Sequence, residues 1–113
     1  MAIAPLNEFK SLTHKVTTTP TIIYTTPIAI STIVLKVQVA NASENPEDVS
    51  WITCSHVRGG VRTKVVHKGP VLANDFSVIS DGKLILQEGD SLEVQASANN
   101  TLELILNFLE TSA

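Results

Sequence analysis

The stretch SLEVQASANNTLELILNFLE (residues 91–110) decides the fold class, because it holds two alternating segments separated by a polar turn. Apolar side chains occupy every second position in residues 91–97, and they do so again from Leu102 to Phe108. This period of two predicts β-strands, even though leucine favours helix by propensity. The opposite face of the second strand carries Ile105 and Leu109, so it is either central in a sandwich or covers a contact between subunits. We favour the second interpretation, in which this face covers a contact between subunits.

The rest of the chain repeats this pattern. Gly59-Gly60 suits the positive φ angles of a tight hairpin, and polar or proline-containing segments separate the other alternating runs. We therefore predict an all-β fold, a single antiparallel β-sandwich that is jelly-roll-like, with about eight short strands. The expected strands are residues 22–25, 31–41, 48–57, 61–68, 76–79, 83–87, 91–97 and 102–110.

Three local expectations follow from the alternation. In residues 31–41 the apolar side chains expected on one face are Ile33, Leu35, Val37 and Val39. Trp51 alternates with other apolar residues of its strand, and we expect it in the core. Gly69-Pro70 is expected to end the strand that begins at Val61.

The N-terminal segment differs from the remainder of the chain. It leads into a threonine-rich region interrupted by Pro20 and Pro27, and threonine favours extended backbone. We predict an extended N-terminal arm over residues 1–20 and a β-sandwich domain over residues 21–113. Such an arm can add contact area on neighbouring subunits by strand addition, so its deletion is expected to leave a folded domain that no longer binds its partner.

Composition limits the classes of function. The chain has 113 residues, 43% of them hydrophobic and 17% charged, which argues for one folded domain and against disorder. A net charge of −3 makes binding to nucleic acid unexpected. No apolar run is long enough for a membrane-spanning helix, so no membrane partner is expected.

Catalytic patterns are not found in the sequence. The three histidines lack metal-ligand spacing, and phosphate-binding and serine-nucleophile motifs do not occur. The single cysteine, Cys54, lies in mid-strand, and we expect an inert, buried or half-buried thiol. The expectation is therefore a protein that is not an enzyme and that carries no cofactor and no metal.

Residues 58–68 form a basic hairpin, with Arg58, Arg62 and Lys64 among its cationic groups. Its charges either protect an exposed sheet edge from aggregation or contact an acidic partner surface. We favour the first interpretation.

Several motifs resemble a small family of virion proteins of tailed phages, common among marine and cyanobacterial phages. The resemblance spans about residues 22–110, and the segments that carry it are residues 23–27, 32–35, 39–41, 68–71, 82–92, 97–98, 102–106 and 109–110. It implies a non-enzymatic structural protein of the particle, located in the virion and assembled in the host cytoplasm.

Together these observations predict a capsid decoration or cement protein that stabilises neighbouring capsid subunits. The expected partners are other virion proteins, above all the major capsid protein, and further copies of the chain. A neck, tail or fibre component is one alternative, and a receptor- or glycan-binding module with Trp51 or Tyr24 exposed is another. The candidate interface residues are Ile3, Leu6, Phe9, Leu12, Arg58, Arg62, Lys64, Ile105 and Leu109.

Overall fold

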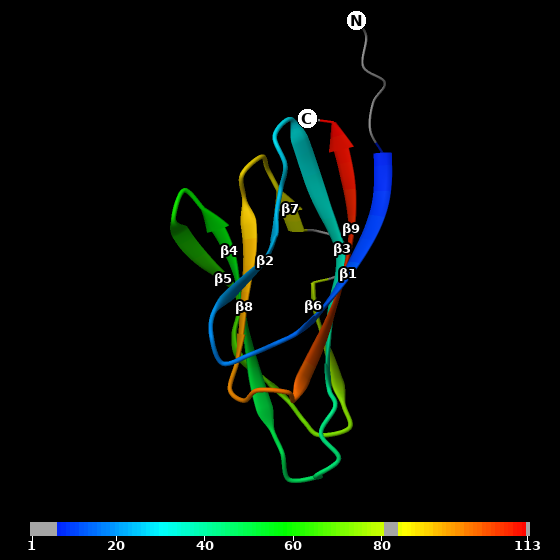
Figure 1. Cartoon of the computed structure of the whole chain (residues 1–113), viewed down its shortest axis with the longest axis vertical. Coiled ribbons are helices and arrows are strands. Elements are labelled where there is room, and N and C mark those ends of the chain that lie inside the picture. Colours follow the sequence, from blue (N-terminus) through cyan, green and yellow to red (C-terminus); the bar gives the residue numbers. More distant parts are fainter. Residues whose placement is uncertain (1–6, 81–83, 113) are drawn as a thin grey trace, which may run out of the picture.

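The computed structural model describes residues 7–80 and 84–112. All regular secondary structure in that part of the chain is β-strand. Two antiparallel sheets pack face to face (Figure 1), which confirms the predicted β-sandwich. The strands are β1 (Asn7–Lys15), β2 (Thr21–Thr25), β3 (Ile30–Asn41), β4 (Ser50–Arg58), β5 (Val61–Val71), β6 (Phe76–Ser80), β7 (Leu84–Leu86), β8 (Ser91–Ala96) and β9 (Leu102–Ser112).

The strand order is that of a jelly roll, in which the chain passes back and forth between the sheets. The five-stranded sheet has the order β1-β9-β3-β6, with β7 also pairing with β3. The four-stranded sheet has the order β2-β8-β4-β5. The first and last strands are therefore neighbours, and β6 and β7 lie one after the other along β3.

The N-terminal segment contributes a strand to the sandwich. β1 pairs with β9 without a register shift from Asn7 to Lys15, and Val16 is fully buried in the core. β9 is an interior strand of its sheet, with β3 on one side and β1 on the other, so β1 supplies backbone hydrogen-bond partners for the second edge of β9. Residues 7–16 thus belong to the sandwich, which corrects the predicted arm over this part of the chain and leads us to expect that its deletion impairs folding. Residues 1–6 lie outside the described residues.

A β-bulge in β3 divides its apolar residues between two faces. The register with β9 passes from Val34↔Phe108 to Lys36↔Asn107, so that Leu35 is an extra residue. Val34 and Val37 are consequently both buried, whereas Ile33 lies opposite Leu109 on the outer face. The prediction that Ile33 shares a face with Val37 was wrong, because one inserted residue reverses the alternation.

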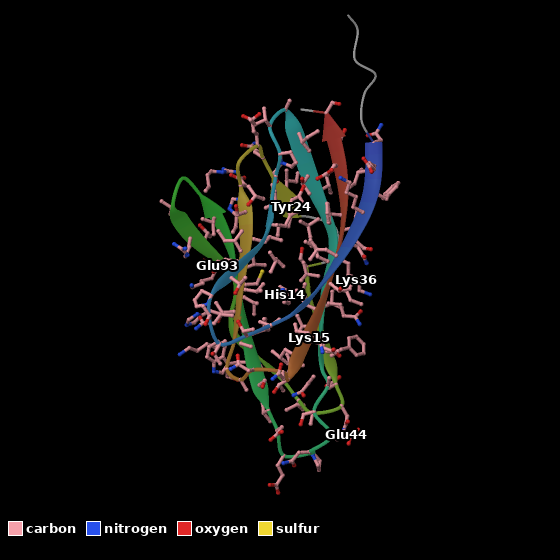
Figure 2. The ribbon with its side chains drawn as sticks, viewed as in Figure 1. His14, Lys15, Tyr24, Lys36, Glu44 and Glu93 are labelled. Atoms are coloured by element: carbon pink, nitrogen blue, oxygen red, sulfur yellow. The ribbon has the colours of Figure 1, made fainter. Side chains whose placement is uncertain are left out.

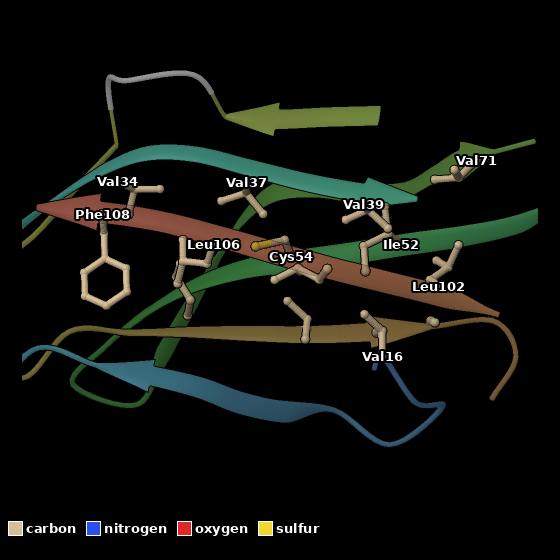
Figure 3. Close-up of a cluster of buried hydrophobic side chains, with 14 of the residues drawn as sticks. Val16, Val34, Val37, Val39, Ile52, Cys54, Val71, Leu102, Leu106 and Phe108 are labelled. Atoms are coloured by element: carbon tan, nitrogen blue, oxygen red, sulfur yellow. The ribbon is translucent and has the colours of Figure 1, made fainter. Parts of the chain in front are cut away.

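The core lies between the sheets, where Figure 3 shows Val37, Cys54 and Leu106 pointing inward. On β4 the inward residues are Ile52 and Cys54, each 1% exposed. Trp51 is half-buried on the other side of this strand, outside the core cluster, with the Lys68 ammonium 5.5 Å from its ring centroid. The prediction that Trp51 lies in the core was therefore wrong, because Ile52 and Cys54 point inward and Trp51 lies on the opposite face of β4.

The β4–β5 hairpin turns at Gly59-Gly60, which have φ angles of 57° and 78°, as the sequence predicts. β5 does not end at Gly69-Pro70 but continues to Val71. Proline is tolerated there because β5 is an edge strand. No further described strand pairs with its open side, so no backbone N–H donor is needed on that side. A Cβ at Gly69 would lie 2.7 Å from the Val66 side chain, so glycine is required for this close packing.

Candidate functional site

The outer face of the five-stranded sheet carries a row of apolar side chains that crosses four strands. The register places Phe9 opposite Leu109, Leu109 opposite Ile33, and Ile33 opposite Ile85. Directly opposite residues share a face, so these four side chains form one continuous row. Phe9 is 75% exposed and Ile85 is 56% exposed, and the two residues between them are half-buried.

A second group of apolar side chains extends this surface along the sheet. Ile105 lies opposite Gln38, which in turn lies opposite Val78, and Phe76 lies opposite Ala40. We call these residues, together with the row above, the outer apolar face: Phe9, Ile33, Phe76, Val78, Ile85, Ile105 and Leu109. Clusters of exposed apolar side chains on one face mark interaction sites in soluble proteins.

Between the two groups the face is polar and hollowed. Lys36 and Asn107 lie opposite each other, and Ser11 lies on the far side of Asn107. A shallow hollow of about 300 Å³ is found here, lined by Phe9, Lys10, Ser11, Leu35, Asn107 and Phe108. A partner that covers the face would therefore have to supply a side chain for the hollow and a polar or acidic group for Lys36.

The candidate interface residues predicted from the sequence separate into distinct places. Phe9, Ile105 and Leu109 do share the outer apolar face. Leu12 points the other way and packs against the core, whereas Ile3 and Leu6 lie outside the described residues. The sequence analysis missed four members of this face: Ile33, Phe76, Val78 and Ile85. Their outward orientation depends on the strand register, which the sequence pattern alone does not provide.

The two arginines of the basic hairpin are neutralised by carboxylates within the chain. Arg58 forms a two-point ion pair with Asp90, at 2.9 and 2.6 Å, and Arg62 forms another with Glu93, at 2.8 and 2.9 Å. The Lys64 ammonium lies 3.4 Å from the Ser55 hydroxyl. Both carboxylates belong to β8 or to the turn before it, so these arginines hold the hairpin against its own sheet.

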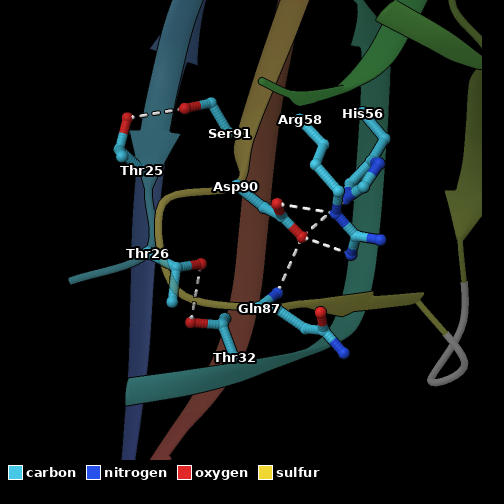
Figure 4. A network of polar contacts seen from close by, with 8 residues as sticks. All are labelled: Thr25, Thr26, Thr32, His56, Arg58, Gln87, Asp90 and Ser91. Atoms are coloured by element: carbon cyan, nitrogen blue, oxygen red, sulfur yellow. Dashed lines mark hydrogen bonds and ion pairs between the residues drawn. The ribbon is translucent and has the colours of Figure 1, made fainter. Parts of the chain in front are cut away.

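Asp90 is the centre of a polar network (Figure 4). Its carboxylate also contacts the His56 imidazole at 3.0 Å and accepts a hydrogen bond from the backbone N–H of Gln87 at 2.8 Å. The hydrogen bonds from Arg58 hold the pKa of Asp90 well below its usual range and outweigh the opposing effect of burial. The network ties the turn before β8 to β4.

The arrangement around His56 lacks the other parts of a hydrolytic site. Within residues 7–80 and 84–112 its imidazole bonds to the Asp90 carboxylate and to no hydroxyl or thiol. A nucleophile within hydrogen-bond reach is what such a His–Asp pair needs for acyl transfer. The described part of the chain also holds no group of three histidine, cysteine, aspartate or glutamate side chains placed to hold a metal ion.

Cys54 is 1% exposed, and burial raises the pKa of its thiol to about 12. The thiolate is the reactive form, so this cysteine is a poor nucleophile in the folded chain. In the described residues there is also no helix of the length and apolar character that crossing a bilayer requires.

The two aromatic residues that a glycan site would use are both engaged. The Tyr24 hydroxyl is bound inside the sandwich by Glu110 and Thr32, at 2.6 and 2.7 Å. Trp51 lies beneath Lys68, as described above.

Comparisons with known proteins show a likeness to a solved structure. No family model matches the chain, and no curated protein matches it. A similar solved structure comes from the Bacillus endospore appendages, which form "a novel family of disulfide-linked pili". The TM-score is 0.56 at 15% identity, and the alignment covers 96% of this chain and 89% of that one. At such low identity the likeness shows a shared fold.

Proposed function

We propose that this chain is a non-enzymatic structural subunit that attaches to a larger protein assembly through its outer apolar face. The observation that carries the proposal is the row Phe9–Leu109–Ile33–Ile85, which the strand register aligns across the sheet. A partner that covers this row removes apolar surface from water, which is the main favourable contribution to protein association. The expected partner surface is apolar, with an acidic or hydroxyl group facing Lys36.

In its finer form the proposal is a virion protein, a capsid decoration or cement protein that binds neighbouring copies of the major capsid protein. The resemblance of residues 22–110 to small tailed-phage virion proteins supports it, as does the exposed apolar face of the five-stranded sheet, which can contact a repeated lattice. Each copy contributes a modest contact, and many copies together stabilise the particle. A neck, tail or fibre position is the alternative form of the same structural role.

The Bacillus endospore appendages with the similar fold form pili, and this is a further, weaker support for a structural role. The disulfide linkage of those pili is not expected here. The one cysteine of this chain is Cys54, and it lies in the core where another copy cannot reach it.

The first experiment is quantitative peptide mass spectrometry of purified phage particles from the source culture. A copy number comparable to that of the major shell protein is expected for a decoration or cement protein. A small fixed number per particle would overturn the decoration role in favour of the neck or tail. Absence from the particles would overturn the virion proposal altogether.

A binding experiment tests the surface itself. Ile85→Glu introduces a charge into the apolar row, and Val61→Glu introduces the same charge at a 66% exposed position on the other sheet. We expect the first variant to lose co-sedimentation with particles stripped of the native protein and the second to retain it. Equal binding by both variants would exclude the outer apolar face as the attachment site.

A further inference from the structure

β1 presents an open backbone edge at the rim of the five-stranded sheet, seen on the right of Figure 1. It pairs with β9 on one side, and no other described strand pairs with its second side. The strand is nine residues long, without proline and without a register shift. Its outward N–H and C=O groups therefore form a regular template for another strand.

The other edges of the two sheets carry features that discourage such pairing. β2 contains a register shift and lies between Pro20 and Pro27. β5 contains two register shifts, the cations Arg62 and Lys64, and Pro70. The edge formed by β6 and β7 consists of short strands, with a shift in the pairing of β6. Bulges, charges and prolines at sheet edges are devices against edge-to-edge association. β1 has neither a bulge nor a proline, although it also carries charged residues, namely Glu8, Lys10 and Lys15.

We propose that a second copy of the chain binds at this edge, β1 to β1 and antiparallel, about a two-fold axis at Ser11. This axis pairs all nine residues of each strand and keeps outward side chains opposite outward ones. Phe9 then lies opposite Thr13, and Lys10 lies opposite Leu12. A two-fold contact of this kind is self-complementary, as in most homodimers.

Charge selects this register over its neighbours. An axis at Lys10 would place the two lysines opposite each other, and an axis at Leu12 would place Lys10, and no carboxylate, opposite His14. Shifts that put the axis between two residues would place outward side chains opposite inward ones. With the axis at Ser11, the cross-strand partner of His14 is Glu8 of the second copy, and like charges are not opposed.

His14 gives an independent indication of a missing partner. Figure 2 labels it towards the end of β1, and its Nε2 atom is buried without a hydrogen-bond partner among the described residues. Buried polar atoms are nearly always hydrogen-bonded in native proteins. The proposed register brings an acceptor, the carboxylate of Glu8 of the second copy, to the residue that lacks one.

The dimer joins two five-stranded sheets into one continuous sheet and brings the two outer apolar faces side by side. It does not depend on the proposed function, since a β1-paired dimer can form whether or not the chain binds particles.

The test is sedimentation velocity of the whole chain over a dilution series, together with two matched variants. Ser11→Glu places two carboxylates face to face at the axis, whereas Thr63→Glu adds the same charge to an exposed position of β5. We expect the native chain and Thr63→Glu to dimerise and to dissociate on dilution, and Ser11→Glu to remain monomeric at every concentration tested. A native chain that stays monomeric, or a Ser11→Glu chain that dimerises like the native one, would overturn the proposal.

A second measurement uses the native chain alone, so that the proposal does not rest on the folding of a variant. Amide hydrogen exchange in β1 should be slowed at high concentration and should become faster on dilution, with no matching change in β5. Exchange in β1 that is independent of concentration would contradict the dimer. Particle binding by the Ile85→Glu and Val61→Glu pair is a separate result, so failure of either proposal is distinguishable from failure of the other.

Discussion

The hydroxyl of Tyr24 donates a 2.6 Å hydrogen bond to the carboxylate of Glu110, and this bond joins the two sheets near one end of the sandwich. Glu110 is only 4% exposed, and the Lys10 ammonium approaches its other oxygen at 2.7 Å. Burial opposes ionisation of Glu110, but the hydrogen bonds from Lys10 and Tyr24 outweigh it, so that its pKa is lowered. β1, β2 and β9 thus meet at one buried carboxylate.

We expect Tyr24→Phe to lower the free energy of unfolding by about 1–2 kcal/mol, because the hydrogen bond to a buried carboxylate is lost. The ring can stay in place against Phe108, whose centroid lies 4.5 Å from that of the tyrosine. Urea denaturation measures the difference. Phe9→Leu, at a 75% exposed position, is the control and should change stability little. Equal stability of Tyr24→Phe and the native chain would show that the bond contributes nothing net.

Acid should destabilise the protein through Asp90. Its pKa in the folded state is lower than in the unfolded chain, because Arg58 and the other donors favour the carboxylate. Stability from this group is thus fully present above the ordinary carboxyl pKa of about 4, and it is lost as pH falls further towards the folded-state value.

Asp90→Asn isolates this contribution. We expect it to lower the free energy of unfolding at neutral pH by about 2 kcal/mol and to make stability less dependent on pH in the acid range. Thermal unfolding at several pH values checks both expectations. An unchanged slope of stability against pH would mean that another carboxylate, such as Glu110, dominates the acid response.

The thiol of Cys54 should not react with a disulfide reagent in the folded protein. Its side chain is 1% exposed and its pKa is raised to about 12, so both access and the thiolate fraction are small. Reaction should appear only as denaturant unfolds the chain, and its rate should follow the unfolded fraction. Rapid labelling without denaturant would contradict the buried position.

Deletion of residues 1–20 should impair folding, because it removes β1 and the buried Val16 and leaves β9 with an unpaired edge. Circular dichroism and a thermal melt are the measurements. A shorter deletion, of residues 1–6, removes no residue of β1 and is the matched control. If the longer deletion melted cooperatively at the native temperature, β1 would be dispensable for the fold.

The sequence predicts most of the strands correctly, because each of them satisfies a local rule. Leu102 to Phe108 alternate strictly, and Gly59-Gly60 suits a tight hairpin; both features are found as expected. Residues 7–15 carry only a weak alternation, and the threonine-rich segment that follows them suggested an arm. Their assignment to a strand depends on β9, which lies far away in the sequence.

The candidate site depends still more on contacts between distant residues. Ile105 and Leu109 were identified from the flip side of one strand, but Ile33 joins them only because of the bulge at Leu35. The ion-pair partners of the arginines could not be predicted from the neighbouring sequence either, since Arg58 and Asp90 are 32 residues apart.

The sequence by itself determined that the chain is all-β and where nearly all of its strands run. It also determined which alternate residues of the last strand share a face, namely Leu102, Leu104, Leu106 and Phe108, and this face lies in the core. These properties follow from side-chain alternation and turn residues, which act over a few neighbouring positions. The tertiary structure alone decided which strands are neighbours, which edge is left open and which apolar residues share the outer face. Those properties depend on register, and register is set by long-range pairing that the local pattern leaves free.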